Sequence, residues 1–477
     1  MTNPLLLQGH RPIEFADFQK RCRELLDAGY SPLHYFGTAA GFLYALFGKS
    51  GALELLSAAY PPSGAYTSLT KDYPAFGIFE RLLYEEFQIQ ALGHPWLKSV
   101  RNPFPEESHH YDYPFFNSNS KSLHEVGVGP VHAGVIEPGH FRFICKGETV
   151  EHLEIRLGFQ HRGVEQMMLG SNICAKSALA ESIAGDTAIG HNLAYCRLVE
   201  ALCKTPAKAE HIRIIALEME RIAMHLADLS ALAADVAYIM GQNLFAALRT
   251  TVINSSLAIC GSRFGKRWLC PGGVNYSINR SQAQVLKDTL FEARTQMIDC
   301  AEAMLNNVSV LSRFDDTGVL QAEDVHKLAL SGLAAKASGI PVDARADYPF
   351  EESAVFIPLC ESSGDVFARA RLRYREIMQS LQIVLDTIDK IPFEDSYITE
   401  LQAPANDSIA ISIVEGFRGR IVHMACTDNA GKIAWYRILD PSLCNWQGLA
   451  LAMRSTDISD FPICNKSFDL SYCGSDL

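Results

Sequence analysis

The feature that most constrains this fold is a long stretch of helical periodicity, which begins after residue 166 and continues to about residue 391. Apolar side chains recur there at spacings of three and four residues, the pattern of helices that bury one face. The strongest runs lie at 176–204, 207–240, 282–312 and 364–391. The longest uninterrupted apolar runs, such as AAGFLYALF at 39–47, are shorter than the roughly 18–20 residues of a membrane-spanning helix, so we expect a chain that is soluble by itself.

Strand patterns flank the helical region. Residues 140–145 and 149–157 alternate like an antiparallel hairpin, and 409–440 reads as three strands joined by turns. Residues 1–100 are mixed α/β, and the segment 76–101 reads as an amphipathic helix that runs into a Gly-His-Pro turn. A breaker-rich stretch at 101–122 reads as a linker. We therefore predict an α+β chain: a small α/β domain at 1–100, a linker at 101–122, and a long-helix core with antiparallel β elements at 123–477.

Charge and cysteine usage exclude several classes of protein. With 48% apolar residues and a formal net charge of −12, the chain has the composition of a globular protein, and nucleic acid is not an expected partner. The first residues lack the pattern of a secretory signal. The thirteen cysteines are scattered and none has C-x-x-C spacing, which favours reduced thiols in the cytosol over a disulfide framework.

Two charged helix faces are candidates for function. Glu218, Arg221, His225 and Asp228 share one face of the helix at 207–240, where an ion-paired structural face is favoured over a proton path. Four arginines crowd the start of the helix at 364–391, and a solvated basic face is favoured there over a docking site for an acidic partner. These four are Arg369, Arg371, Arg373 and Arg375.

A third candidate is the loop GPVHAGVIEPGHF, in which His132 and His140 flank Gly134 and Glu137. Two histidines and a carboxylate could relay protons or bind a metal, although ordinary hydrogen bonding is the commoner use of a loop histidine. Arg345 could pair with a neighbouring aspartate. The residues we select as catalytic candidates are Glu137, His140, His132, Arg345 and Asp365.

Seven motifs, taken in order, resemble the large subunit of membrane-bound, energy-converting [NiFe]-hydrogenases, a family homologous to the quinone-site subunit of complex I. The resemblance runs from about residue 125 to residue 477. The motifs are GPVHAGVIEPGHFRF (129–143), LEIRLGFQHRGVEQ (153–166), AGDTAIGHNLAYCRLVEAL (184–202), LEMERIAMHLADLSALAADVAY (217–238), FGKRWLCPGGVN (264–275), GDVFARARLRYREIMQSL (364–381) and EGFRGRIVHMA (415–425). The segment 76–101 is similar to the small α/β subunit of complex I, and the formate hydrogenlyase large subunit joins the two modules in this order.

The departures from the family pattern concern its metal site. Family hydrogenases hold nickel and iron with two C-x-x-C motifs, because soft thiolates bridge and stabilise the two metals. The match places Ala184, Thr187, Ser471 and Gly474 at those four positions, so we expect no nickel site. Shifted ligation by Cys473 or Cys174 is the less favoured alternative. The sequence ends three residues after Gly474, so no cleavable C-terminal extension is expected.

The complex I side of the resemblance implies a quinone site. A loop histidine, His140 rather than His132, would match one residue near the quinone head group, but the tyrosine position of that site falls on Ile173. Reduction of a quinone therefore stands as the alternative function, and a quinone as the alternative ligand.

The resemblance implies a large subunit of a membrane-associated, ion-translocating oxidoreductase complex, without hydrogenase activity of its own. It would couple electron transfer from an Fe–S partner to the membrane arm, peripherally on the cytoplasmic side of the membrane. We expect no cofactor in this chain, since its iron–sulfur clusters would belong to partners. The expected partners are an Fe–S small subunit, a ferredoxin-like subunit and antiporter-like membrane subunits. The alternatives are a quinone-reducing, NADH dehydrogenase-like subunit and a structural scaffold.

Overall fold

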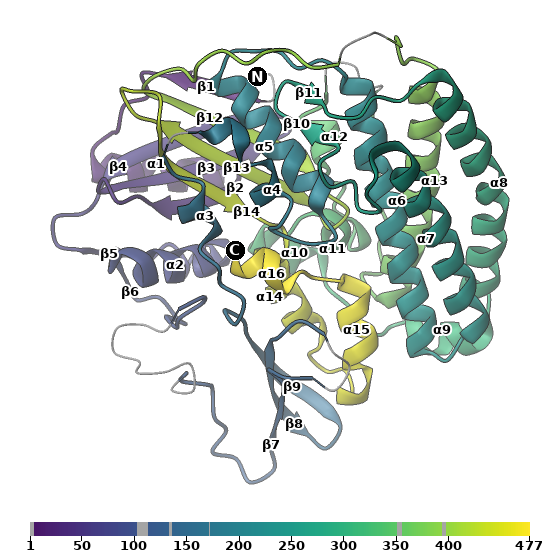
Figure 1. Cartoon of the computed structure of the whole chain (residues 1–477). Helices are drawn as coiled ribbons and strands as arrows, with labels where there is room; N and C mark the ends of the chain where they lie inside the picture. The colour runs from purple at the N-terminus through teal and green to yellow at the C-terminus, as the bar shows by residue number, and fades with distance from the viewer. Residues whose placement is uncertain (1–3, 103–112, 133–135, 171, 351–354, 394–396) are drawn as a thin grey trace.

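Four long helices stand side by side at one end of the molecule (Figure 1). They are α6 (Glu210–Asp235), α7 (Ile239–Cys260), α8 (Arg280–Leu305) and α13 (Val366–Ile388). The computed structural model describes residues 4–102, 113–132, 136–170, 172–350, 355–393 and 397–477. Side-chain caps start two of the helices: Asn279 forms a capping box with Gln282 on α8, and Asp365 accepts a 2.8 Å bond from the Ala368 N–H on α13.

A four-stranded antiparallel sheet lies beside the helices. Its order is β1 (Leu5–Gln8), β12 (Ser408–Glu415), β13 (Arg420–Thr427) and β14 (Ile433–Leu439), so the first strand of the chain pairs with a strand near its other end. Helix α5 (Ala188–Leu202) packs on β12 and β13. Every residue of β12 is buried, which fits a strand covered on both faces.

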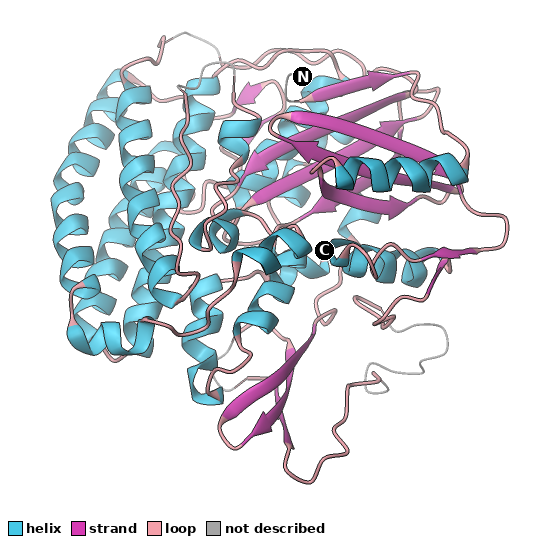
Figure 2. Ribbon diagram, turned by 180° about the vertical axis from the view of Figure 1, so that it is seen from behind, coloured by secondary structure: helices cyan, strands magenta, loops and turns pink. Residues whose placement is uncertain are grey.

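The N-terminal region forms its own antiparallel sheet of β2 (Ser31–Gly37), β3 (Phe42–Lys49) and β4 (Ala52–Ala59). Helix α1 (Phe15–Asp27) packs against β4 and α2 (Gly77–Phe87) against β2 (Figure 2). This sheet shares an apolar core with β12–β14, since the rings of Phe36 and Tyr44 lie 5.2 and 5.0 Å from Trp435. The division at 101–122 stays a prediction, because residues 103–112 lie outside the described residues.

A three-stranded sheet of β7 (His124–Val128), β8 (His140–Lys146) and β9 (Thr149–Arg156) projects from the molecule at the bottom of Figure 1. It packs on the C-terminal helices α14 (Ser442–Ala452), α15 (Phe461–Phe468) and α16 (Tyr472–Asp476). The remaining elements are β5 (Ala65–Thr67), η1 (Pro74–Phe76), β6 (Gln90–Leu92), α3 (Val164–Met167), η3 (Ile173–Ala175), α4 (Ser177–Ala180), β10 (Leu269–Cys270), β11 (Gly273–Val274), α9 (Val308–Phe314), α10 (Ala322–Leu328), α11 (Gly332–Ala337), α12 (Ala344–Asp347) and η4 (Ile458–Asp460).

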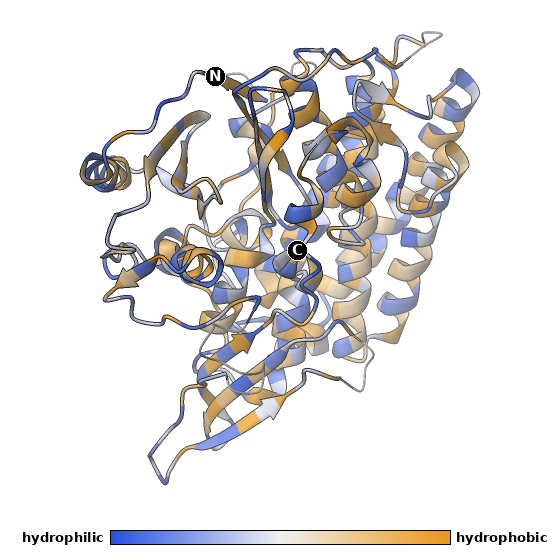
Figure 3. Ribbon diagram, turned by 60° about the vertical axis from the view of Figure 1, so that its left-hand side comes forward, coloured by the Kyte–Doolittle hydropathy of each residue, from blue (hydrophilic) through white to orange (hydrophobic). Residues whose placement is uncertain are grey.

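The α+β class is confirmed, with two differences in element boundaries. The helix expected to run into the Gly-His-Pro turn at 93–95 ends earlier, at Phe87, because Gln88 takes a left-handed conformation. The predicted helix at 176–204 divides into α4 and α5, and the loop between them carries Ala184 and Thr187. Hydrophilic and hydrophobic residues are interspersed along the long helices (Figure 3), and in the described part of the chain no helix is long and apolar enough to cross a membrane.

Candidate functional site

The loop before α5 and the start of α16 lie side by side, although Ala184 and Ser471 are 287 positions apart in sequence. Arg162 joins the two segments, since its guanidinium donates to the carbonyl of Ile183 at 2.9 Å and to that of Cys473 at 3.3 Å. The thiol of Cys473 also contacts the backbone of Gly185. The structure therefore brings together the positions that the family resemblance assigns to metal ligands, and all four are buried.

Oxygen and nitrogen groups occupy the space around these positions. Arg418 donates two 2.6 Å bonds to Asp186, a 2.9 Å bond to Asp469 and a 3.2 Å bond to the Thr187 hydroxyl. A Cβ at Gly474 would lie only 2.7 Å from the Asp440 carboxylate, so that side chain already fills the space. A methyl group, two hydroxyls and a glycine hydrogen do not fit a nickel–iron centre, which needs four thiolates.

Arg418 determines the charge of this region. Burial opposes ionisation of Asp186, but the guanidinium outweighs it and lowers the pKa of that carboxyl. A second chain of hydrogen bonds runs from Asp440 to His191 at 3.0 Å, on to His423 at 3.1 Å, and to the Tyr436 hydroxyl at 2.7 Å. Burial, together with His191, holds the pKa of His423 well below its usual range. His423 is therefore neutral.

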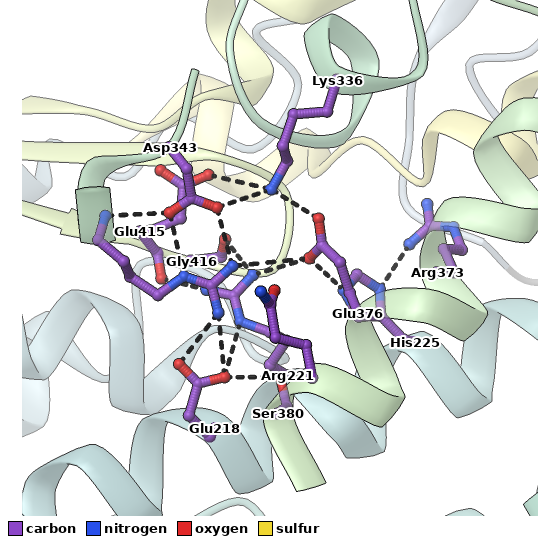
Figure 4. Close-up of polar contacts among 12 residues, drawn as sticks. Glu218, Arg221, His225, Lys336, Asp343, Arg373, Glu376, Ser380, Glu415 and Gly416 are labelled. Carbon is purple, nitrogen blue, oxygen red and sulfur yellow. Dashed lines mark hydrogen bonds and ion pairs between the residues drawn. The ribbon is translucent and has the colours of Figure 1, made fainter. Parts of the chain in front are cut away.

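The polar contacts continue from Asp469 into the helical core. Asp469 hydrogen-bonds to Asp228, which also pairs with Arg373. Arg373 donates to Nδ1 of His225 at 3.1 Å, and Nε2 of His225 lies 3.1 Å from Glu376 (Figure 4). Burial lowers the pKa of His225 to about 3, so this ring is neutral. Burial also raises the pKa of Asp228 well above its ordinary value, so the two aspartates can share one proton.

Lys336 links the inner half of the cluster. Its ammonium lies 2.6 Å from Glu376, 2.9 Å from Asp343 and 3.8 Å from Glu415 (Figure 4). Arg345 donates to Asp343 at 3.0 Å and to Glu218 at 3.1 Å. Burial, with Asp343 close by, raises the pKa of Glu415 to about 7. A carboxyl with that pKa exchanges its proton near neutral pH.

These groups form one ion-pair network of thirteen residues, of which eleven are buried and two, Asp186 and Asp469, are partly exposed; we call it the buried ion-pair network. Its seven carboxylates face five permanent cations and one neutral histidine, which leaves an excess of two negative charges. Two bound protons would balance it. Burial raises the pKa of Asp228 and of Asp469, and that of Glu415 to about 7, so these three carboxyls take up a proton more readily than an ordinary carboxyl does. The members are Asp186, Glu218, Arg221, His225, Asp228, Lys336, Asp343, Arg345, Arg373, Glu376, Glu415, Arg418 and Asp469.

Glu137 lies at the outer edge of this site, where its carboxylate contacts the thiol of Cys473. The two histidines of the same loop bind its backbone instead: His132 lies 2.9 Å from the Gly139 carbonyl and His140 lies 2.9 Å from the Gly129 carbonyl. Gly134 lies outside the described residues. Of the three candidates in this loop, the structure places only Glu137 against Cys473, which lies between Ser471 and Gly474.

The remaining candidates separate into two kinds. Arg345 belongs to the network, whereas Asp365 caps α13 and accepts from the Ser363 hydroxyl at 2.7 Å. The prediction of a solvated basic face at the start of α13 is wrong for two of its four arginines, because Arg369 is only 1% exposed and Arg373 0%. Arg369 donates to the Ser467 hydroxyl at 2.7 Å. The favoured reading of the α6 face as ion-paired agrees with these contacts, but its partners are buried inside the chain.

The sequence reasoning missed Arg418, Lys336 and Asp469. Arg418 lies within a quoted motif, yet its partner Asp186 is 232 positions away, and local spacing carries no signal for that contact. In the described part of the chain, no group of three or more His, Cys, Asp or Glu side chains is placed to hold a metal ion.

Known proteins resemble this chain over most of its length. The family model of the respiratory-chain NADH dehydrogenase 49 kDa subunit matches residues 235–405. The carbon monoxide-induced hydrogenase of Rhodospirillum rubrum is 27% identical over 73% of this chain and 98% of its own length. Hydrogenase-4 component G of Escherichia coli is 27% identical over 76% of this chain, and the match spans 63% of that component.

A solved structure shows the same fold. A chain of the membrane-bound sulfane sulfur reductase, an archaeal respiratory membrane complex, superposes with a TM-score of 0.69 at 22% identity, over 76% of this chain and 100% of that one. Together with the motif order, these matches confirm the resemblance. By sequence the chain is similar to the complex I 49 kDa subunit and to subunits of membrane-bound hydrogenases.

Proposed function

We propose that this large subunit works without a nickel–iron site and couples electron transfer from an Fe–S partner to the membrane arm of an ion-translocating complex. The observation that supports the proposal concerns the four positions at which the family hydrogenases have their metal-binding cysteines. Ala184, Thr187, Ser471 and Gly474 are buried together, none carries a thiol, and Arg418 fills the region with ion pairs.

The buried ion-pair network supplies the groups that such coupling needs. Its two excess carboxylates bind protons, and a negative charge arriving nearby raises the proton affinity of a carboxyl. The Asp228–Asp469 pair is hydrogen-bonded on one side to the Arg418 ion pairs and on the other, through Arg373 and His225, to Glu376. Protons taken up on reduction of a neighbouring centre would be held in this chain and released on reoxidation.

The proposed partners follow from the same proposal. They are an Fe–S small subunit, a ferredoxin-like subunit and antiporter-like membrane subunits, with the chain bound peripherally at the cytoplasmic face. The finding that relatives are subunits of membrane-bound complexes supports this arrangement. The iron–sulfur clusters would belong to the partners, and no observation favours a bound quinone in this chain.

The first test measures metal and hydrogenase activity. The chain, tagged and purified with its partners, is analysed for nickel and assayed for hydrogen uptake with a dye acceptor. We expect much less than one nickel per chain and no uptake. About one nickel per chain, together with hydrogen uptake, would refute the proposal.

The second test separates coupling from a scaffold role. Asp228→Asn removes a proton-sharing carboxyl while keeping its shape. Asp389→Asn is a matched control at an exposed site directly after the end of α13. In the assembled complex we expect Asp228→Asn to lower ion pumping at least tenfold, and Asp389→Asn to leave it unchanged. Normal pumping by an assembled Asp228→Asn complex would instead support a scaffold.

A further inference from the structure

A cavity of about 160 Å³ lies between the N-terminal region and the C-terminal helices. It is lined by parts of α2, β9, α14 and α16, which come together near the C-terminus in Figure 1. Its described lining residues include no member of the buried ion-pair network. An apolar cavity where structural units meet is a common place for a small ligand. Its aliphatic lining comes from three parts of the chain and includes Ile78, Val100, Leu153, Ile155, Leu443 and Leu451.

One face of α14 forms a wall of this cavity. Lining residues on α14, and one in the turn after it, are spaced three or four positions apart, as residues on one side of a helix are. They are Leu443, Trp446, Gln447, Ala450, Leu451 and Arg454. Leu443 is 6% exposed, Gln447 is partly exposed and Arg454 is exposed. The wall therefore changes from buried and apolar to exposed and cationic, so the cavity opens to solvent beside Arg454.

The charged groups of the lining are mostly cations. Three arginines, Arg81, Arg156 and Arg454, line the cavity together with one carboxyl, that of Asp476. His152 also lines it, but burial lowers the pKa of this histidine, so its ring is neutral. The described lining residues therefore carry at least two more positive charges than negative ones. A cation beside an apolar wall attracts an anion more strongly than it does in bulk water.

Two of these cations have no carboxylate partner among the described residues. The buried guanidinium of Arg81 donates to the carbonyl oxygens of Lys98 at 2.7 Å and Ser99 at 2.8 Å, which hold it in place but carry no charge. The guanidinium of Arg454 forms no hydrogen bond or ion pair within the described part of the chain. Arg454 is therefore available to an anion at the mouth of the cavity.

We propose that this cavity binds a medium-chain fatty acid, with the alkyl chain against the aliphatic lining and the carboxylate beside Arg454 at the mouth. An engineered apolar cavity of about 150 Å³ holds one benzene molecule, so about six carbons fit into this one. Octanoate would place six carbons inside and its carboxylate at the mouth. The proposal does not depend on the absence of nickel or on ion pumping.

The test titrates octanoate into the full chain and follows tryptophan fluorescence, because Trp96 and Trp446 line the cavity. Isothermal titration calorimetry measures the Kd independently. Each buried methylene should tighten binding about fourfold, so octanoate should bind about 15-fold more tightly than hexanoate. Decanoate should gain less than twofold over octanoate, because its extra carbons stay in water. Octan-1-ol, which has the same chain length without the charge, should bind about fivefold more weakly than octanoate.

Two variants separate the apolar contacts from the charged one. Ala450→Phe fills part of the cavity and should weaken octanoate binding at least about tenfold, whereas Ala303→Phe, at an exposed site on α8, should leave it unchanged. Arg454→Gln, at the exposed mouth, should weaken octanoate binding about fivefold and leave that of octan-1-ol unchanged.

Thermal melts show whether each variant is folded, and Arg454→Gln decides the matter if Ala450→Phe is not. The proposal is overturned if octanoate changes neither the fluorescence nor the heat signal, or if octan-1-ol binds as tightly as octanoate. It is also overturned if a folded Ala450→Phe chain, or the Arg454→Gln chain, binds octanoate like the wild type.

Discussion

Glu220 offers a sharp test of the electrostatics next to the site. Its buried carboxylate accepts bonds from the backbone N–H groups of Ile189 at 2.7 Å and Gly190 at 3.0 Å, in the first turn of α5. Burial outweighs these two bonds, and the nearby Asp186 adds to it, so that the pKa of Glu220 rises from 4.5 to about 8. The folded chain therefore keeps this proton at pH 7.

The raised pKa makes stability depend on pH. Below pH 4.5 the folded and unfolded chains both hold the proton, and Glu220 costs nothing. Between pH 4.5 and 8 only the unfolded chain releases it, so the free energy of unfolding falls by about 1.4 kcal/mol per pH unit, or about 5 kcal/mol in all. Glu220→Gln removes this dependence but leaves one backbone N–H without an acceptor, at a cost of about 1–3 kcal/mol.

The free energy of unfolding of the variant, plotted against pH, should therefore cross that of the wild type. We expect Glu220→Gln to be less stable by about 1–3 kcal/mol at pH 4.5 and more stable by about 2–4 kcal/mol at pH 8. Urea denaturation at a series of pH values measures the difference, with the exposed Glu292→Gln on α8 as control. In thermal melts a chain of this length shifts by about 1 °C per kcal/mol. A difference that stays constant from pH 4.5 to 8 would show that Glu220 is ionised in the folded chain.

Three further predictions concern the candidate residues. Arg418→Ala should cost about 1–3 kcal/mol in thermal or urea unfolding, because it removes the buried cation of Asp186 and Asp469, whose side chains are 38% and 33% exposed and so partly screened by solvent; a loss below about 0.5 kcal/mol would contradict the described ion pairs. Asp365→Ala should cost about 1–2 kcal/mol through the lost cap of α13 and leave ion pumping per assembled complex unchanged; a selective loss of pumping would give it a catalytic role. Glu137→Gln should lower pumping in the assembled complex while His140→Ala, whose ring binds the backbone, should not, and equal effects of the two would refute a separate role for Glu137.

Local patterns predicted the elements well where one face of the chain is apolar. The helix expected at 207–240 is α6, and the strands expected in 409–440 are β12–β14. The break between α4 and α5 was not predicted. Apolar residues keep a helical spacing in the sequence across 181–187, although the structure has a short loop there.

The candidate site was predicted only in part, for a different physical reason. The buried arginines Arg369 and Arg373 look like surface residues in sequence, since charged side chains are seldom buried without partners. Their partners Ser467 and Asp228 come from other elements, and spacing along one helix does not report them. The family resemblance, by contrast, predicted that the loop with Ala184 and Thr187 lies near Ser471 and Gly474. It could do so because family members bind one metal site with residues from both segments.

The pairing of β1 with β12 has a consequence for synthesis on the ribosome. Leu5 pairs with Ile411, which is synthesised 406 residues later. At a translation rate of about 5–20 residues per second, β12 therefore emerges about 20–80 s after β1. The apolar face of the β2–β4 sheet stays uncovered for a similar time, until Trp435 has been synthesised and can pack on it. During that interval the nascent chain exposes an unpaired strand and a half-built core, so we expect its yield in cells to depend on chaperones that bind nascent chains.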